Sequence, residues 1–219
     1  MTRKTIAIAD RINVLVAMAL AGRFLLRVIA STPGARIVPI ALGLPAGVFL
    51  ADALSGIVHW FCDTHFRPET TLIGPMLIAP FREHHRDPAA LGRHGVFERN
   101  GNNCVAALPL LAFGAFGNWQ LTRAGEAFGI GCLGAAAITV CLTNQIHAWA
   151  HASAVPPVVR WLQRSRILLA PERHARHHDG SYTCAYAVVS GWSNRWLDQV
   201  LAAKATAGKH RQRQEREVT

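Results

Sequence analysis

The chain has 219 residues, of which 51% are hydrophobic and 16% are charged, and its formal net charge is +10. The charged share lies below the roughly 25% of an average soluble protein. Because the basic residues sit between apolar runs, the composition favours a membrane protein over a nucleic-acid binder. The five cysteines form no CxxC pair, which argues against a disulfide framework and for reduced thiols.

Four apolar segments predict membrane helices, and they are residues 12–30, 37–60, 104–121 and 127–146. A spanning helix needs about 20 residues, which the second and fourth segments supply and the third nearly supplies. Arg23 and Arg27 interrupt the first segment. It therefore either spans with its arginines reaching an interface or lies flat on the membrane. We expect an all-α membrane protein with about four transmembrane helices.

The distribution of Lys and Arg predicts the orientation of these helices. The basic residues concentrate before the first apolar segment, in 61–103 and after residue 147, with Arg23, Arg27, Arg36 and Arg123 as exceptions. Basic loops favour the cytoplasmic side. We therefore expect a multi-pass protein with both ends in the cytoplasm.

Ten of the eleven histidines fall in four short stretches that lie on this same predicted side: 59–65, 81–94, 147–151 and 174–178. Neutral imidazole is a common ligand for iron, copper and zinc. A single tetrahedral zinc takes four ligands, so this many histidines predict two metals. The sequence thus predicts a cytoplasmic, His-rich helical cap, and an oxygen-activating di-iron enzyme is the simplest interpretation.

The spacing of the histidines indicates how they reach the metals. His147 and His151 are four residues apart, so on a helix they share one face. His174 shares a face with His177 and His178 in the same way. Adjacent histidines point about 100° apart on a helix, so each adjacent pair can serve two different metals. The pair at 84 and 85 offers the same divergence.

Carboxylates accompany the histidines. Asp63 follows His59 by four residues, and we expect it to accept a hydrogen bond from an imidazole N–H, with direct ligation as the alternative. Asp52 lies within a predicted span and is expected to face the protein interior. Further residues that can support ligands are Glu83, Asp87, Glu98 and Asn103.

Two other enzyme classes find no support in the sequence. A zinc protease of the HExxH type needs a glutamate between two histidines, and no such order occurs. A serine hydrolase of the GxSxG type lacks its motif as well.

Several blocks resemble the Kua-type lipid desaturase domain family, which includes the plasmanylethanolamine desaturases. The segments that carry the resemblance are ADALSG at 51–56, PFREHHRDP at 80–88, NQxHxWxH at 144–151 and HxxHH at 174–178. Arg93-His94, Glu98, Asn100-Gly101-x-Asn103 and Gly191-Trp192 match as well, and the resemblance covers about residues 50–198. His65 departs from the pattern, because animal members carry an aromatic residue there.

The resemblance implies a membrane desaturase with two iron ions, O2 as co-substrate and an external electron donor, a ferredoxin or a b-type cytochrome. It implies a phospholipid substrate within the bilayer and no nucleic acid. The favoured reaction is formation of the vinyl ether bond of plasmalogens from an alkyl ether phospholipid. The alternatives are desaturation of an acyl chain near its carbonyl, as in the plant branch, a lipid hydroxylase, and a metal-binding membrane protein without catalysis.

The predicted organisation follows from these segments. Residues 1–36 would form a tail and a first, weak membrane helix, 37–200 the desaturase domain, and 201–219 a basic polar tail that contains His210. Asp63 is a predicted catalytic residue and His94 a further candidate ligand. The predicted ligands, which are also the other predicted catalytic residues, are His59, His84, His85, His147, His151, His174, His177 and His178.

Overall fold

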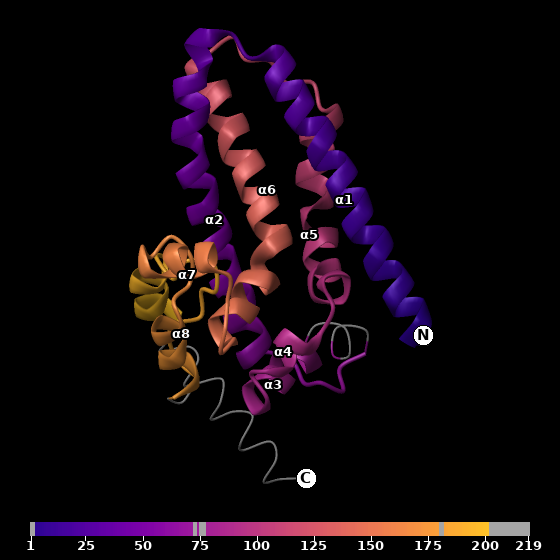
Figure 1. Ribbon diagram of the computed structural model, residues 1–219, viewed down its shortest axis with the longest axis vertical. Helices are drawn as coiled ribbons and strands as arrows, with labels where there is room; N and C mark the ends of the chain where they lie inside the picture. Colours follow the sequence, from indigo (N-terminus) through magenta and orange to yellow (C-terminus); the bar gives the residue numbers. More distant parts are fainter. Residues whose placement is uncertain (1–2, 72–73, 75–77, 180–181, 202–219) are drawn as a thin grey trace. The chain divides into compact units, whose positions relative to one another are not determined.

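The computed structural model describes residues 3–71, 74, 78–179 and 182–201, and every regular element in these ranges is helical (Figure 1). The described chain divides into two compact units, residues 1–51 with 94–145 (unit 1) and 52–93 with 146–219 (unit 2). Because all regular elements of the described residues are helices, the expected all-α class is confirmed. The elements are α1 (Arg3–Ser31), the 3-10 helix η1 (Gly34–Arg36), α2 (Ile37–Thr64), α3 (Ala79–Arg86), α4 (Ala90–Arg93), α5 (Val96–Phe116), α6 (Ala124–His151), α7 (Pro157–Arg164) and α8 (Pro171–His178).

Three described helical segments are long and apolar enough to cross a membrane: Lys4–Ser31, Gly34–Thr64 and Ala124–His151. They contain the first, second and fourth apolar segments of the sequence. The expected segment 104–121 is not among them, because α5 ends at Phe116. The first turns of α5 are polar, which leaves its apolar part shorter than the roughly 20 residues of a full span. The finding supports three to four spans.

In unit 1, α1 packs along α5. Val14 and Ala17 of α1 are buried in one cluster with Cys104, Ala107 and Leu111 of α5. Small residues at this contact allow close approach of the two helices. Helix α1 is therefore packed against another helix of the same unit along its buried face.

The two arginines that interrupt the first apolar segment have hydrogen-bond partners. Arg23 donates to the carbonyl of Ala115 at 3.1 Å, and Arg27 donates to the carbonyls of Gly114 at 3.2 Å and Gly117 at 3.0 Å. These carbonyls belong to the C-terminal end of α5, where backbone oxygens lack helical partners and the helix dipole favours cations. The two arginines therefore satisfy carbonyl groups that would otherwise lack hydrogen-bond donors at the end of α5.

Glycines bring α2 and α6 into backbone contact. A Cβ atom at Gly47 would lie 2.1 Å from the carbonyl oxygen of Cys132, and one at Gly43 would lie 2.2 Å from that of Phe128. Gly131 of α6 meets the carbonyl oxygen of Ile40 in the same way. Membrane helices use glycines in this manner because van der Waals packing drives their association.

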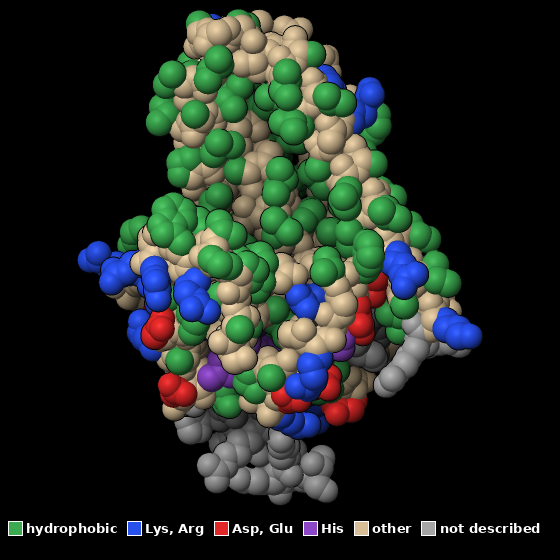
Figure 2. Space-filling model, viewed as in Figure 1, with side chains coloured by type: hydrophobic (Ala, Val, Ile, Leu, Met, Phe, Trp, Pro, Cys, Tyr) green, Lys and Arg blue, Asp and Glu red, His purple; other side chains and the backbone are tan. Residues whose placement is uncertain are grey.

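The outer faces of the long helices are apolar. Figure 2 shows hydrophobic side chains over the visible face of these helices. Leu26, Ile29 and Val38 are each about two-thirds exposed, with many similar residues along the same helices. A soluble protein rarely exposes contiguous apolar surface of this kind. The exposed faces suit contact with lipid and indicate a multi-pass membrane protein.

The glycine contact gives a test of this packing. Gly47→Ala is expected to destabilise unit 1 by about 1–3 kcal/mol, because the new methyl group would displace the backbone of α6. Gly129→Ala is the matched control, since a Cβ at Gly129 meets nothing within 4 Å. Thermal unfolding of both variants in detergent micelles measures the difference. Equal melting midpoints for the two variants would contradict the described contact.

Candidate metal centre

Unit 2 gathers the predicted ligands from four helices. The end of α2 carries His59 and Asp63, and α3 carries His84 and His85. The last turns of α6 and all of α8 supply the other five histidines. These are His147, His151, His174, His177 and His178.

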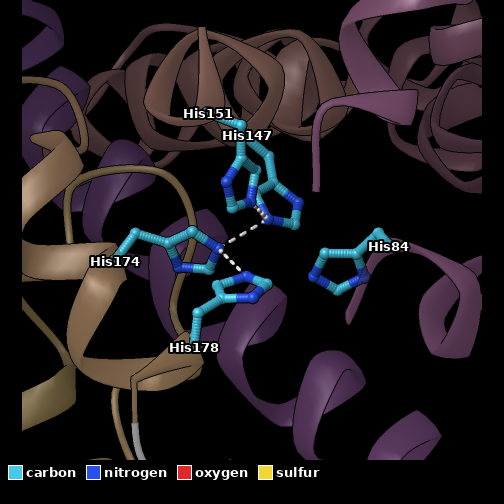
Figure 3. A group of neighbouring side chains, drawn as sticks. All are labelled: His84, His147, His151, His174 and His178. Atoms are coloured by element: carbon cyan, nitrogen blue, oxygen red, sulfur yellow. Dashed lines mark hydrogen bonds between the residues drawn. The ribbon is translucent and has the colours of Figure 1, made fainter. Parts of the chain in front are cut away.

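The side chains form two adjoining groups, each with its candidate ligand atoms within 4.8 Å of one another. Figure 3 shows the rings of the larger group converging. Adjacent histidines divide between the groups: His84 belongs to one and His85 to the other, with ring centroids 4.4 Å apart. His177 and His178 divide in the same way. The larger group is His84, His147, His151, His174 and His178, and the smaller group is His59, Asp63, His85 and His177.

The distances within the groups fit metal ligation. The Nε2 atom of His147 lies 2.8 Å from that of His174 and 3.2 Å from that of His151. The Nε2 atom of His174 lies 3.1 Å from that of His178. Two nitrogen ligands about 2.1 Å from one ion and at right angles to each other lie about 3 Å apart. The nitrogens therefore have the spacing of ligands around a common ion.

Backbone carbonyls determine the tautomer of three of these rings. Nδ1 of His59 lies 3.0 Å from the carbonyl oxygen of Tyr186, and Nδ1 of His177 lies 2.7 Å from that of Cys184. Nδ1 of His84 lies 2.7 Å from the oxygen of Phe81. A carbonyl only accepts, so each Nδ1 carries the proton and each neutral ring has its lone pair on Nε2.

Two of these lone pairs have no hydrogen-bond partner among the described residues. The Nε2 atoms of His59 and His84 are buried and receive no hydrogen bond there. A buried polar atom without a partner costs about 1–3 kcal/mol. A metal ion in each group would remove that cost, since His84 belongs to the larger group and His59 to the smaller, and the donor set therefore fits metals.

Burial keeps three imidazoles outside the membrane segments neutral, those of His84, His174 and His178. Burial, with the neighbouring His178 and His151, lowers the pKa of His84 to about 3. Burial, with His151 and His177, lowers the pKa of His178 to about 4. The pKa of His174 also falls well below its ordinary value, chiefly through burial. At neutral pH these rings therefore offer lone pairs instead of protons.

Asp63 lies among the ligand atoms of the smaller group. One carboxylate oxygen lies 3.4 Å from Nε2 of His177, 3.5 Å from Nε2 of His59 and 3.6 Å from Nε2 of His85. We expected the carboxylate to orient a ring through its N–H group. The Nδ1 atoms of His59 and His177 use backbone carbonyls instead, so the Asp63 carboxylate faces the Nε2 atoms of these two rings, as the alternative of direct ligation requires.

Asp52 anchors the loop that supplies two of these carbonyls. It is fully buried, as expected, and one carboxylate oxygen accepts the N–H groups of Val189, Ser190 and Gly191 at 2.7–3.2 Å. The other oxygen accepts the N–H and hydroxyl groups of Ser193 at 2.9 and 2.7 Å. Five donors satisfy the buried charge. The loop that begins after α8 is thereby attached to α2, the helix that carries His59.

The other sequence candidates lie outside both groups. His94 belongs to unit 1, where its side chain is 46% exposed and pairs with Glu98 at 2.9 Å. Asp87 pairs with Arg93 at the surface. His65 is exposed and stacks on Phe61 with ring centroids 5.0 Å apart. Glu83 is also exposed. His210 lies outside the described residues, as do residues 202–219 of the expected tail.

Sequence reasoning missed the backbone acceptors and Tyr182. The carbonyls of Phe81, Cys184 and Tyr186 hold three rings, and Tyr182 stacks on His85 with ring centroids 4.3 Å apart. Any residue type supplies a carbonyl, so no sequence signal identifies these positions. The only sequence signal for the contact of Tyr182 with His85 is its position four residues after the HxxHH stretch.

These features define a class, an all-helical protein with several candidate membrane spans and two adjoining histidine-rich metal-binding groups. Residues 48–205 match the lipid desaturase domain, and the chain belongs to this family.

The chain is similar to three curated relatives. It is 40% identical over 154 residues to a plasmanylethanolamine desaturase of Myxococcus xanthus, covering 70% of this chain and 54% of the relative. It is 36% identical over 168 residues to plasmanylethanolamine desaturase 1 of Mus musculus, covering 74% and 61%. It is 32% identical over 161 residues to the chloroplastic fatty acid desaturase 4 of Arabidopsis thaliana, covering 73% and 48%. The chain thus spans about half the length of these relatives, and no solved structure matches it.

The two groups predict two metal ions per purified chain. His174→Ala and His59→Ala should each lower the metal content, because each removes a ligand from a different group. His94→Ala should retain both ions, and His65→Phe is the control for handling. Elemental analysis by mass spectrometry measures the ratio of metal to protein. One ion per wild-type chain, or loss of metal in His94→Ala, would contradict the two-group arrangement.

The role of Asp52 gives a second test at the site. Asp52→Asn places an amide NH2 against backbone donors and is expected to cost about 2–4 kcal/mol of stability. Asp87→Asn is the matched control, because the Asp87 side chain pairs with Arg93 at the surface and lies outside both metal groups. Thermal unfolding and metal content are measured together. Wild-type stability and full metal content in Asp52→Asn would contradict an anchoring role.

Proposed function

We propose that this protein is a di-iron lipid desaturase that introduces the vinyl ether double bond into an alkyl ether phospholipid. The observation that carries the proposal is the pair of largely buried, adjoining groups of imidazoles in a member of the lipid desaturase family. The choice of an ether substrate rests on the relatives named plasmanylethanolamine desaturase, at 40% and 36% identity, against 32% for the chloroplastic fatty acid desaturase.

The donor set supports iron. The candidate ligands are eight imidazoles and one carboxylate, with no thiolate in either group. Imidazole with carboxylate suits non-haem iron, whereas structural zinc prefers four ligands in a closed tetrahedron. Five candidate ligands beside four others are more than the four that one structural zinc ion takes. We assign Asp63 to the ligands of the second ion.

With two irons bound, the centre supplies oxygen activation for the removal of two hydrogens from neighbouring carbons. The balanced reaction converts the CH2–CH2 unit beside the ether oxygen, with O2, two electrons and two protons, into CH=CH and two waters. The electrons come from a carrier protein, a ferredoxin or a b-type cytochrome.

The chain's own residues position the reaction and protect it from water. His59, His174 and His177 are fully buried, so bulk water has no access to their rings. The carbonyls of Tyr186 and Cys184 hold the rings in one tautomer. A closed, preorganised site of this kind protects reactive species from side reactions.

We place the histidine-bearing ends of α2 and α6 on the cytoplasmic side. The segments that follow both ends are rich in arginine, whereas the turn between α1 and α2 carries only Arg36. Basic segments remain in the cytoplasm. The reacting carbons would then lie near the glycerol of a lipid in the cytoplasmic leaflet.

Expression in cells that contain alkyl ether lipids but make no plasmalogen tests the function. Acid-labile vinyl ether lipid should appear in the presence of oxygen and should be absent with His84→Ala or His174→Ala. His65→Phe, outside both groups, should retain the product. Mass spectrometry of the lipids measures it. If only ester-linked acyl chains gain a double bond near the carbonyl, the acyl-lipid alternative replaces the ether substrate.

A further inference from the structure

A groove of about 360 Å³ in unit 2 adjoins the metal groups along the chain. The loop after α6, helix α7 and the start of α8 form its walls. Ala152 in its lining directly follows His151, and Glu172 precedes His174 by two residues. A ligand in this groove therefore lies beside backbone that carries two candidate metal ligands.

The floor of the groove is fixed by a buried glutamine. The side-chain amide of Gln163 donates to the carbonyl of Trp149 at 3.3 Å and to that of Leu169 at 3.1 Å. These bonds join α7 to α6 and to the segment before α8. The charged side chains of the groove thus project from elements that are held together.

Three charged side chains in the lining have no partner among the described residues. Arg160 and Arg164 lie four residues apart on α7 and share a face. Both are exposed, as is Glu172, and no side-chain hydrogen bond or ion pair joins any of them to another described residue. Two unpaired guanidinium groups on one face repel each other, and an anion between them would relieve the repulsion.

The other faces of α7 have the composition of a helix at a membrane surface. Val158 and Trp161 are 62% and 60% exposed and lie on one face, while Val159 and Gln163 form the buried face. A short helix with an apolar exposed face, a basic face and a tryptophan is typical of the lipid headgroup region. At such a surface the arginine face of α7 would meet lipid headgroups.

We propose that this groove is the headgroup subsite for the lipid substrate, in which Arg160 and Arg164 bind the phosphate and Glu172 binds a primary ammonium group. The assignment rests on the proposed function. A groove lined by one carboxylate and two guanidiniums matches a zwitterion better than a simple anion. A primary ammonium donates hydrogen bonds to Glu172, which a quaternary ammonium cannot do. Only the glycerol separates such a phosphate from the first alkyl carbons.

Binding of short-chain lipids to the purified full chain in micelles tests the subsite without catalysis. Wild-type protein should bind dihexanoyl phosphatidylethanolamine more tightly than the choline or glycerol lipid. The double variant Arg160→Gln, Arg164→Gln should weaken binding of all three lipids by about tenfold or more. Glu172→Gln should remove the preference for the ethanolamine lipid. Arg195→Gln, an exposed arginine outside the groove, is the matched control.

The outcomes separate this proposal from the function on which it rests. Wild-type binding and preference in the Arg160, Arg164 and Glu172 variants would overturn the subsite, whether or not vinyl ether lipid forms. Displacement of the lipid by inorganic phosphate as effectively as by phosphoethanolamine would also overturn it, since the groove would then be a simple anion site. The expected binding pattern without vinyl ether product would support the subsite and contradict the proposed reaction.

Discussion

The central physical constraint in this protein is that a cluster of imidazoles must remain neutral inside a largely apolar chain. Protonated rings at these distances would repel one another and would be costly to bury. The burial that lowers the pKa of His84 and His178 keeps these two rings neutral, so each has an unshared electron pair to offer in the larger group. Metal ions stabilise such an arrangement, because they supply the positive charge that the rings cannot carry themselves.

The surrounding structure serves this constraint through backbone groups. Carbonyls of the loop after α8 accept the Nδ1–H groups of His59 and His177, and Asp52 holds the same loop through five donors. Asp52 and His59 are both on α2, so one helix carries both a ligand and the anchor of that ligand's acceptor. This coupling explains why a buried carboxylate without a place in either metal group is part of the domain.

Helical periodicity made much of the site predictable. The spacing of His147 with His151, and the divergence of adjacent histidines, follow from 3.6 residues per turn. Whether Asp63 faces an N–H group or a lone pair of His59 and His177 depends on where the loop carbonyls lie. No local sequence pattern reveals the position of these carbonyls. The partners of Asp52 are separated from it by more than a hundred residues, beyond any local pattern. The apolar segment was expected to reach residue 121, whereas α5 ends at Phe116, because Trp119 and Leu121 add apolar character to the loop that follows the helix.

The central claim is that two adjoining groups in unit 2 hold two irons. An anomalous difference map from crystals measured above and below the iron absorption edge tests it directly. The account predicts two peaks per chain, one among His84, His147, His151, His174 and His178, the other among His59, Asp63, His85 and His177. A single peak, or two peaks that persist below the iron edge and respond at that of zinc, would contradict it.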